Sequence, residues 1–116
     1  MQEVTIWHNP KCSKSRNALS LLEENKIEAN VIEYLENIPT KEEIKNILQL
    51  LSINAKDLLR KGELIYQELN LSNIDDEDTL IKAMAENPIL IERPIIIKNN
   101  KAVIARPIEN LENLLK

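Results

Sequence analysis

The chain begins with an apolar run, a short polar loop and an amphipathic run, and this order constrains its fold more than any other feature. Val4–Trp7 is apolar on both faces, which is typical of a strand covered on both sides of a sheet. Pro10 interrupts the loop, and residues 13–24 then carry apolar side chains at helical spacing. Because residues 29–35 again carry strand-forming apolar side chains, at positions 31, 32, 34 and 35, the pattern predicts a right-handed βαβ unit with two parallel strands.

Helical signals dominate the middle of the chain. Thr40 and Glu43 have the spacing of a capping box before an apolar stripe. Asn54 is a candidate N-cap for a short helix, and residues 75–78 supply acidic side chains for the start of another. The sequence therefore predicts a run of helices in this region.

The last part of the chain predicts a hairpin and a final helix. Residues 95–97 and 102–105 are apolar and flank a polar turn, and residues 108–115 have apolar side chains in helical step. We therefore expect an α/β fold. It would be a single thioredoxin-like domain over residues 1–116, with a four-stranded mixed sheet and a helical insertion at about residues 40–87.

The composition and charge disfavour several classes of protein. A length of 116 residues suffices for one hydrophobic core, and a net charge of −4 argues mildly against nucleic-acid binding. No apolar run approaches the roughly 20 residues of a membrane span, and the first residues lack the pattern of a signal peptide. One cysteine and one histidine rule out a disulfide framework and disfavour a zinc site. Because an unpaired thiol fits a reducing compartment, we expect a cytoplasmic protein without a membrane or nucleic-acid partner.

The lone cysteine, Cys12, lies where the first helix is expected to begin. Unpaired backbone N–H groups and the positive end of the helix dipole converge at such a position, favour the thiolate and are able to hold an oxyanion. Lys11, Lys14 and Arg16 add positive charge, so we expect the pKa of Cys12 to fall below its usual value of about 8.5. A lone cysteine is otherwise often a small buried hydrophobic residue. The polar, cationic surroundings favour a reactive nucleophile instead.

The other three arginines, Arg60, Arg93 and Arg106, each lie at the edge of a predicted element. Proline follows Arg93 and Arg106 and favours an extended backbone at both, so these side chains would project from defined positions. Guanidinium groups bind tetrahedral oxyanions in a bidentate manner. Solubility at the surface explains any one of these arginines alone. As a set with Cys12, they favour an anion-binding site.

The loop pattern His8-Asn9-Pro10-x-Cys12-x-x-Ser15-Arg16 resembles the active-site loop of the glutaredoxin-coupled arsenate reductases. Four further stretches resemble that family in the same order: Tyr34-Leu35-Glu36-Asn37-x-Pro39-Thr40, Leu58-Leu59-Arg60-Lys61, Asn87-Pro88-Ile89-Leu90-Ile91-x-Arg93-Pro94 and Arg106-Pro107. The match spans nearly the whole chain, and the combination of motifs is highly specific.

This resemblance implies a thioredoxin-like fold and an arsenate reductase activity. Cys12 matches the nucleophile that attacks arsenate, and His8 matches a histidine that helps to lower the pKa of that thiol. Arg60, Arg93 and Arg106 match the arginines that bind arsenate and the intermediates. Glutathione then acts as a co-substrate that forms a mixed disulfide, glutaredoxin resolves it, and arsenite leaves. We expect no bound cofactor, and the lack of a second cysteine agrees with a need for external thiols.

Several residues of the expected site admit more than one interpretation. Ser15 stands where a two-cysteine motif carries its resolving thiol, and it either caps the helix or donates to the thiolate. His8 is as typical of a satisfied structural residue as of a tuning cation. We assign Ser15 and Arg16 to the expected substrate-binding site, together with the three other arginines. Pro94 matches a family proline that is often cis beside the active cysteine.

Two other functions fit parts of the same pattern. Spx-type transcription factors share the fold and bind RNA polymerase, but they usually carry a Cys-x-x-Cys switch where this chain has Ser15. A thiol-transfer enzyme acting on glutathionylated proteins would not need three anion-binding arginines. Both details favour the reductase. The sequence does not distinguish arsenate from a related oxyanion, and it leaves the oligomeric state open.

Overall fold

The computed structural model of the protein describes residues 4–115, and these form two compact units. The sheet unit contains the residues up to Asn37 and those from Arg93 onward, and the helical unit contains Ile38–Glu92. The helical unit thus occupies the region where the sequence predicts a helical insertion. That residues 1–116 fold as a single domain stays a prediction.

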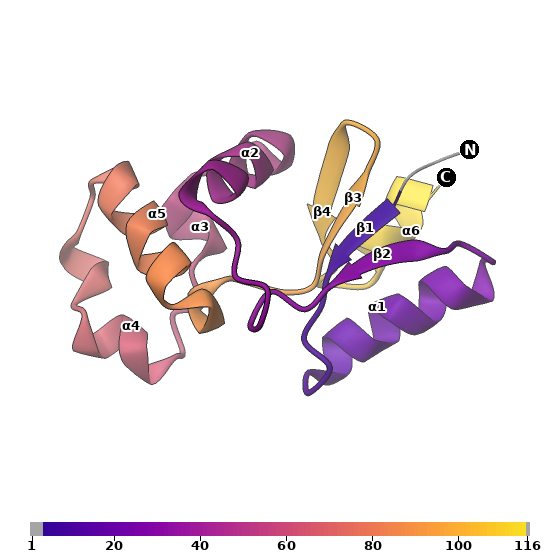
Figure 1. Ribbon diagram of the computed structural model, residues 1–116, viewed down its shortest axis with the longest axis horizontal. Helices are drawn as coiled ribbons and strands as arrows, with labels where there is room; N and C mark the ends of the chain where they lie inside the picture. The colour runs from indigo at the N-terminus through magenta and orange to yellow at the C-terminus, as the bar shows by residue number, and fades with distance from the viewer. Residues whose placement is uncertain (1–3, 116) are drawn as a thin grey trace. The chain divides into compact units, whose positions relative to one another are not determined.

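The sheet unit is built on four strands in the order β2-β1-β3-β4 (Figure 1). These strands are β1 (Val4–Trp7), β2 (Ala29–Ile32), β3 (Ile95–Lys98) and β4 (Lys101–Ile104). β1 pairs in parallel with β2 and antiparallel with β3, and β3 pairs antiparallel with β4. The prediction of a four-stranded mixed sheet that starts with a parallel βαβ unit is therefore confirmed.

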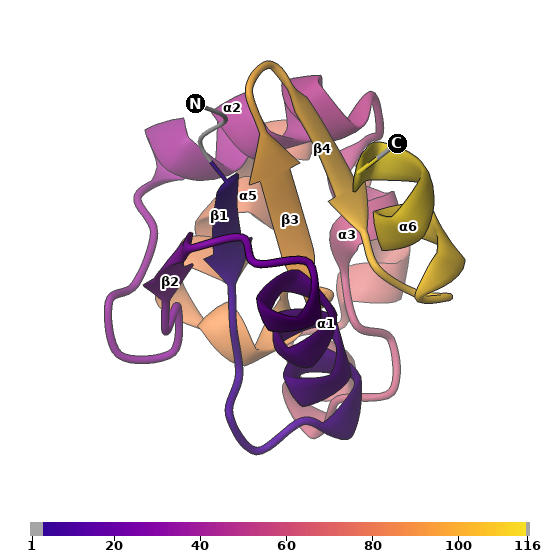
Figure 2. The same ribbon diagram turned by 90° about the vertical axis from the view of Figure 1, so that its right-hand side faces the viewer.

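Two helices, α1 (Ser13–Glu24) and α6 (Glu109–Leu115), lie against one face of this sheet (Figure 2). Their inward side chains pack with those of the central strands in one buried apolar core. Its members are Val4, Ile6, Ala18, Leu22, Ile96, Ala105 and Leu111. Because burial of apolar surface is the main favourable term in folding, this core holds α1 against β1 and so restrains the loop that joins them.

β2 is shorter than the strand predicted over residues 29–35. It ends at Ile32, which pairs with Trp7, the last residue of β1. Because its partner strand ends there, the chain turns over residues 33–37. The N–H groups of Glu36 and Asn37 donate to the Glu33 carbonyl in this turn. Tyr34 is therefore a buried turn residue, and its ring stacks with that of Trp7 at a centroid distance of 6.4 Å.

The hairpin of β3 and β4 has a tighter turn than the predicted residues 98–101. Lys98 pairs with Lys101, so the turn consists of Asn99 and Asn100 alone. Asn99 has a φ of 56°, in the left-handed region that asparagine tolerates better than most residues. The antiparallel pairing itself is as predicted.

The helical unit contains short helices joined by tight turns. They are α2 (Lys41–Leu51), α3 (Ala55–Leu58), α4 (Leu64–Glu68), α5 (Glu77–Glu86) and the 3-10 helices η1 (Leu71–Asn73) and η2 (Pro88–Leu90). α2 begins with the predicted capping box: the Glu43 N–H donates to Thr40 Oγ1 at 3.1 Å, and the Thr40 N–H donates to the Glu43 carboxylate at 3.0 Å. Between residues 4 and 115, no helix is both long and apolar enough to cross a membrane.

The start of α3 is satisfied differently from the prediction. Asn54 is the N-cap residue, but its side chain accepts no hydrogen bond from the helix. The Ala55 N–H donates instead to the two carboxylate oxygens of Glu77, the first residue of α5, at 3.2 and 3.0 Å. The partner lies 22 positions further along the chain, so the local pattern around Asn54 could not indicate it.

Candidate active site

Short-range hydrogen bonds close the loop between β1 and α1. The Cys12 N–H donates to the Asn9 carbonyl at 3.0 Å, which makes residues 9–12 a β-turn with Pro10 at its second position. Cys12 has an extended backbone, with φ −98° and ψ 122°, and is the N-cap residue of α1. Arg16 donates through Nη1 to the Pro10 carbonyl at 2.9 Å. The loop therefore places the cysteine at the start of the helix, as the sequence predicts.

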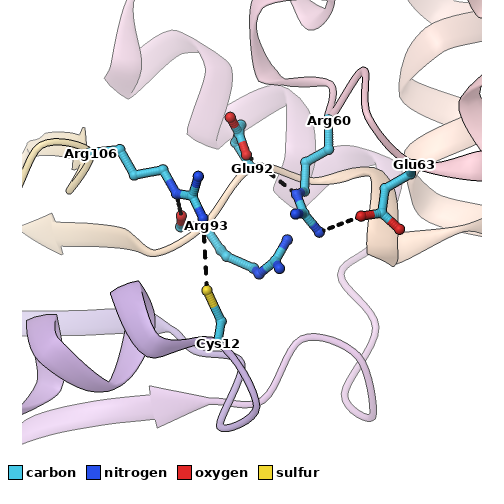
Figure 3. A network of polar contacts seen from close by, with 6 residues as sticks. All are labelled: Cys12, Arg60, Glu63, Glu92, Arg93 and Arg106. Atoms are coloured by element: carbon cyan, nitrogen blue, oxygen red, sulfur yellow. Dashed lines mark hydrogen bonds and ion pairs between the residues drawn. The ribbon is translucent and has the colours of Figure 1, made fainter.

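The thiol of Cys12 lies at the start of α1, beside backbone and side-chain N–H groups that act on its pKa. The residue is 8% exposed, and the backbone N–H groups of Ser15 and Lys14 both lower the pKa of its thiol. Arg106 Nη2 lies 3.8 Å from Cys12 Sγ (Figure 3). Burial is the largest single influence and raises the pKa of the thiol. The backbone donors and Arg106 together outweigh it, so the pKa of Cys12 lies below its ordinary value.

The cation that acts on the thiol is not among those predicted from the sequence. Lys11, Lys14 and Arg16 have exposed side chains, and the guanidinium that lowers the pKa of Cys12 is that of Arg106. Arg106 lies 94 positions further along the chain than Cys12. The expectation of a lowered pKa thus agrees with the structure, and the backbone N–H groups at the start of α1 contribute as expected, but the cation that contributes is a long-range contact.

The strand directions explain why these residues meet. β1 and β4 run in the same direction and β3 runs in the opposite one. Cys12 follows the end of β1, Arg106 follows the end of β4, and Arg93 precedes the start of β3, so all three lie at one edge of the sheet. Arg106 Nε donates to the Arg93 carbonyl at 2.8 Å, which holds the Arg106 guanidinium between that carbonyl and the sulfur (Figure 3).

The side chain of Arg93 is a buried cation with unused donors. The residue is 9% exposed, and its Nε and Nη1 atoms have no hydrogen-bond partner among residues 4–115. The peptide bond from Arg93 to Pro94 is cis, in the form that the family resemblance suggests, and so is the bond from Arg106 to Pro107. Because buried guanidinium N–H groups without an acceptor are unfavourable, this edge of the sheet favours the binding of an anion.

His8 and Ser15 form a buried pair beside the loop. His8 Nδ1 and Ser15 Oγ are 2.7 Å apart, and the Asn9 N–H donates to the same hydroxyl at 3.0 Å. Burial is the largest influence on the pKa of His8 and lowers it; Glu33 raises it, Arg16 lowers it, and the net shift is downward. His8 is therefore neutral near pH 7. Of its two interpretations, the geometry favours the satisfied structural residue. Ser15 lowers the pKa of Cys12 through its backbone N–H, while its hydroxyl is engaged with His8 and Asn9.

Arg60 belongs to the helical unit and has carboxylate partners there. Its Nη1 lies 2.7 Å from Glu63 Oε2, and its Nε lies 3.5 Å from Glu92 Oε1 (Figure 3). Its backbone N–H donates to the Leu90 carbonyl at 2.7 Å, beside an antiparallel bridge between Leu59 and Ile91. The assignment of Arg60 to the oxyanion site stays a prediction.

Sequence reasoning missed the residues that hold the predicted ones in place. Asn9 makes three hydrogen bonds in the Cys12 loop, and its Asn-Pro dipeptide is a turn signal that could have indicated such a role. Glu63 stands three positions after Arg60, a spacing that often brings opposite charges together. No local pattern indicates the contact between Arg60 and Glu92.

A mixed sheet that presents a buried cysteine at the start of its first helix defines a thioredoxin-like α/β protein with a thiol site. Residues 7–114 match the model of the ArsC family, and the chain belongs to this family. The arsenate reductase of Neisseria meningitidis is 47% identical over 99% of this chain and 100% of its own length. That of Acidiphilium multivorum is 38% identical over 99% of this chain and 82% of its own length.

Solved structures agree with these relatives. The structure of an arsenate reductase from Vibrio cholerae matches with a TM-score of 0.93 and 46% sequence identity, and the match covers 97% of each chain. The family recognised in the loop motifs and the thioredoxin-like fold expected from the order of elements are both confirmed.

Proposed function

We propose that this protein is an arsenate reductase in which the Cys12 thiolate is the nucleophile and Arg60, Arg93 and Arg106 bind the oxyanion. The observation that carries the proposal is the buried guanidinium of Arg93, whose Nε and Nη1 have no partner among residues 4–115. A tetrahedral oxyanion would supply the missing acceptors, since guanidinium groups bind such anions strongly. The names of relatives at 38% and 47% identity support arsenate as that anion.

The proposed first step is an attack of Cys12 Sγ on the arsenic atom of arsenate. A sulfur–arsenic bond forms, and one arsenate oxygen leaves as water after protonation. The donors that lower the pKa of Cys12 are the backbone N–H groups of Ser15 and Lys14 and the guanidinium of Arg106. Because these groups already favour negative charge on the sulfur, they would also stabilise the negative charge on the oxygens bound to arsenic.

External thiols complete the proposed reaction, because Cys12 is the only cysteine of the chain. The sulfur of glutathione joins that of Cys12 in a mixed disulfide, and the two electrons that these thiols give up reduce As(V) to As(III), which leaves as arsenite. Glutaredoxin then reduces the mixed disulfide and restores the Cys12 thiol. Since this cycle needs a reducing compartment, we propose that the protein works in the cytoplasm.

The remaining loop residues have supporting roles in this proposal. The buried pair of His8 and Ser15 holds the end of β1 against the start of α1. Arg16 donates a hydrogen bond to the Pro10 carbonyl, and its exposed side chain is accessible to an incoming anion. We assign none of these three residues to the chemical step itself.

A coupled assay tests the proposal. Oxidation of NADPH is followed with arsenate, glutathione, glutaredoxin and glutathione reductase, and the protein is compared with its Cys12→Ser variant. We expect arsenate-dependent turnover that the variant lacks, because serine is not a nucleophile at neutral pH without a base. A flat trace from folded protein with a reactive thiol would exclude arsenate as the substrate.

A further inference from the structure

Asn9 lies at the centre of the hydrogen bonds that shape the Cys12 loop, although the proposed reaction gives it no role. The residue is 5% exposed. Its backbone N–H donates to Ser15 Oγ, its carbonyl accepts from the Cys12 N–H, and its side-chain Oδ1 accepts from the Lys11 N–H, each at 3.0 Å. Asn9 therefore connects the end of β1 by hydrogen bonds to Lys11 and Cys12 in the turn and to Ser15 in α1.

These bonds divide the N–H groups of the loop into two sets. Those of Lys11 and Cys12 point back to oxygen atoms of Asn9. Those of Lys14 and Ser15 lie in the first turn of α1, for which Cys12 is the N-cap residue, and lower the pKa of Cys12. The first set closes the turn, and the second stabilises negative charge on the thiol. A turn that opened would move Cys12 away from the N–H groups at the start of α1.

We propose that Asn9 is a positioning residue for the nucleophile: its side-chain and backbone oxygens hold the 9–12 turn so that the Cys12 sulfur stays against the first N–H groups of α1. The side chain matters because its bond to the Lys11 N–H fixes the backbone on both sides of Pro10. Asparagine suits this position, since its carbonyl oxygen mimics a backbone acceptor two residues before the donor.

The proposal predicts a change in thiol acidity. In Asn9→Ala the bond to the Lys11 N–H is lost and the turn loosens, so the pH midpoint of Cys12 ionisation should rise. We expect a rise of about 0.5 to 1 pH unit, which lowers the rate of alkylation by iodoacetamide, at pH values below the wild-type midpoint, by roughly three- to tenfold. Because Cys12 is the only thiol, both alkylation and thiolate absorbance report on it alone.

Two further variants make the measurement specific. Asn9→Ser keeps a short side-chain acceptor and should restore part of the wild-type midpoint, because serine makes the same turn more weakly. Asn25→Ala is the matched control: Asn25 Nδ2 donates to the Leu21 carbonyl at 2.8 Å, so that variant also loses an asparagine-to-backbone bond, but at the far end of α1. Its midpoint should equal that of the wild type.

The outcomes separate positioning from general stability. A wild-type midpoint in folded Asn9→Ala would overturn the proposal, and so would an equal shift in Asn25→Ala. If Asn9→Ala does not fold by circular dichroism, Asn9→Ser decides: an unshifted midpoint there would overturn the proposal, and a raised one would support it. Thiol ionisation is measured without arsenate, so this test is independent of the outcome of the coupled assay.

Discussion

At the scale of single residues, the site holds positively charged arginine side chains in places where burial makes a charge unfavourable. Arg93 is 9% exposed with two donor atoms unpartnered among residues 4–115, and Arg106 is held between the Arg93 carbonyl and the Cys12 sulfur. A buried charge of this kind costs free energy until an anion joins it. The arrangement therefore favours function over stability, as binding sites commonly do.

Replacement of Arg93 should separate the effect of its buried charge on stability from its effect on the binding of an anion. In Arg93→Met the apolar stem is kept and the charge is removed, so we expect the free energy of unfolding to stay level or to rise by about 1–4 kcal/mol. In the coupled assay, kcat/KM for arsenate should fall by roughly 10²- to 10³-fold, because an oxyanion donor is lost.

The control for this change is Lys82→Met, which removes a positive charge from an exposed position on α5. Lys82→Met should alter neither the free energy of unfolding nor kcat/KM for arsenate appreciably. Undiminished arsenate turnover in Arg93→Met would contradict the role of Arg93, and turnover with glutathionylated proteins in that variant would favour the thiol-transfer enzyme.

At the scale of elements, each start and end has its own physical cause. α2 begins at a capping box that is visible in the sequence, because both partners lie within four residues of each other. β2 ends where β1 ends, because a strand without a partner gains no further ladder bonds. The first N–H of α3 donates to the carboxylate of Glu77, which comes close to it only when the chain folds.

The capping box of α2 gives a direct test at this scale. Thr40→Ala removes the acceptor for the Glu43 N–H, and we expect the free energy of unfolding, measured by urea denaturation, to fall by about 0.5–2 kcal/mol. Ser20→Ala, at an exposed position inside α1, is the comparison. It should change the free energy of unfolding by at most a few tenths of the Thr40→Ala effect. Equal stabilities of Thr40→Ala and the wild type would show that the box contributes nothing.

At the scale of the whole molecule, stability should depend on pH through His8. Burial is the main cause that lowers the pKa of His8 in the folded protein, so the unfolded chain binds the proton more readily. The stability associated with neutral His8 is complete above the ordinary pKa of histidine, about 6.5, and is lost as the pH falls from there toward the lowered pKa.

This prediction is checked by urea denaturation from about pH 7 to about pH 5, below which carboxylates begin to titrate. We expect the free energy of unfolding to fall on acidification, and to fall less in His8→Gln, which cannot take up the proton. The same slope in both proteins would mean that His8 is not the group responsible.

Patterns in the sequence predict the βαβ start, the helical middle, the hairpin, the capping box at Thr40 and the place of Cys12 at the start of a helix, and the structure has each of them. These features depend on periodicity and on neighbours a few residues apart, which the chain shows directly. Its motifs also indicated the ArsC family, because several specific stretches occur in the same order.

The identity of the cation that acts on Cys12 depends on the tertiary structure. The sequence offered Lys11, Lys14 and Arg16 as nearby cations, but Arg106 contacts the thiol, since β1 and β4 run in the same direction and end at the same edge of the sheet. The same holds for Arg93, whose Nε and Nη1 have no hydrogen-bond partner in the part of the chain that the structure describes. Burial and contacts between distant segments arise from strand order and direction, and residue spacing along the chain does not contain them.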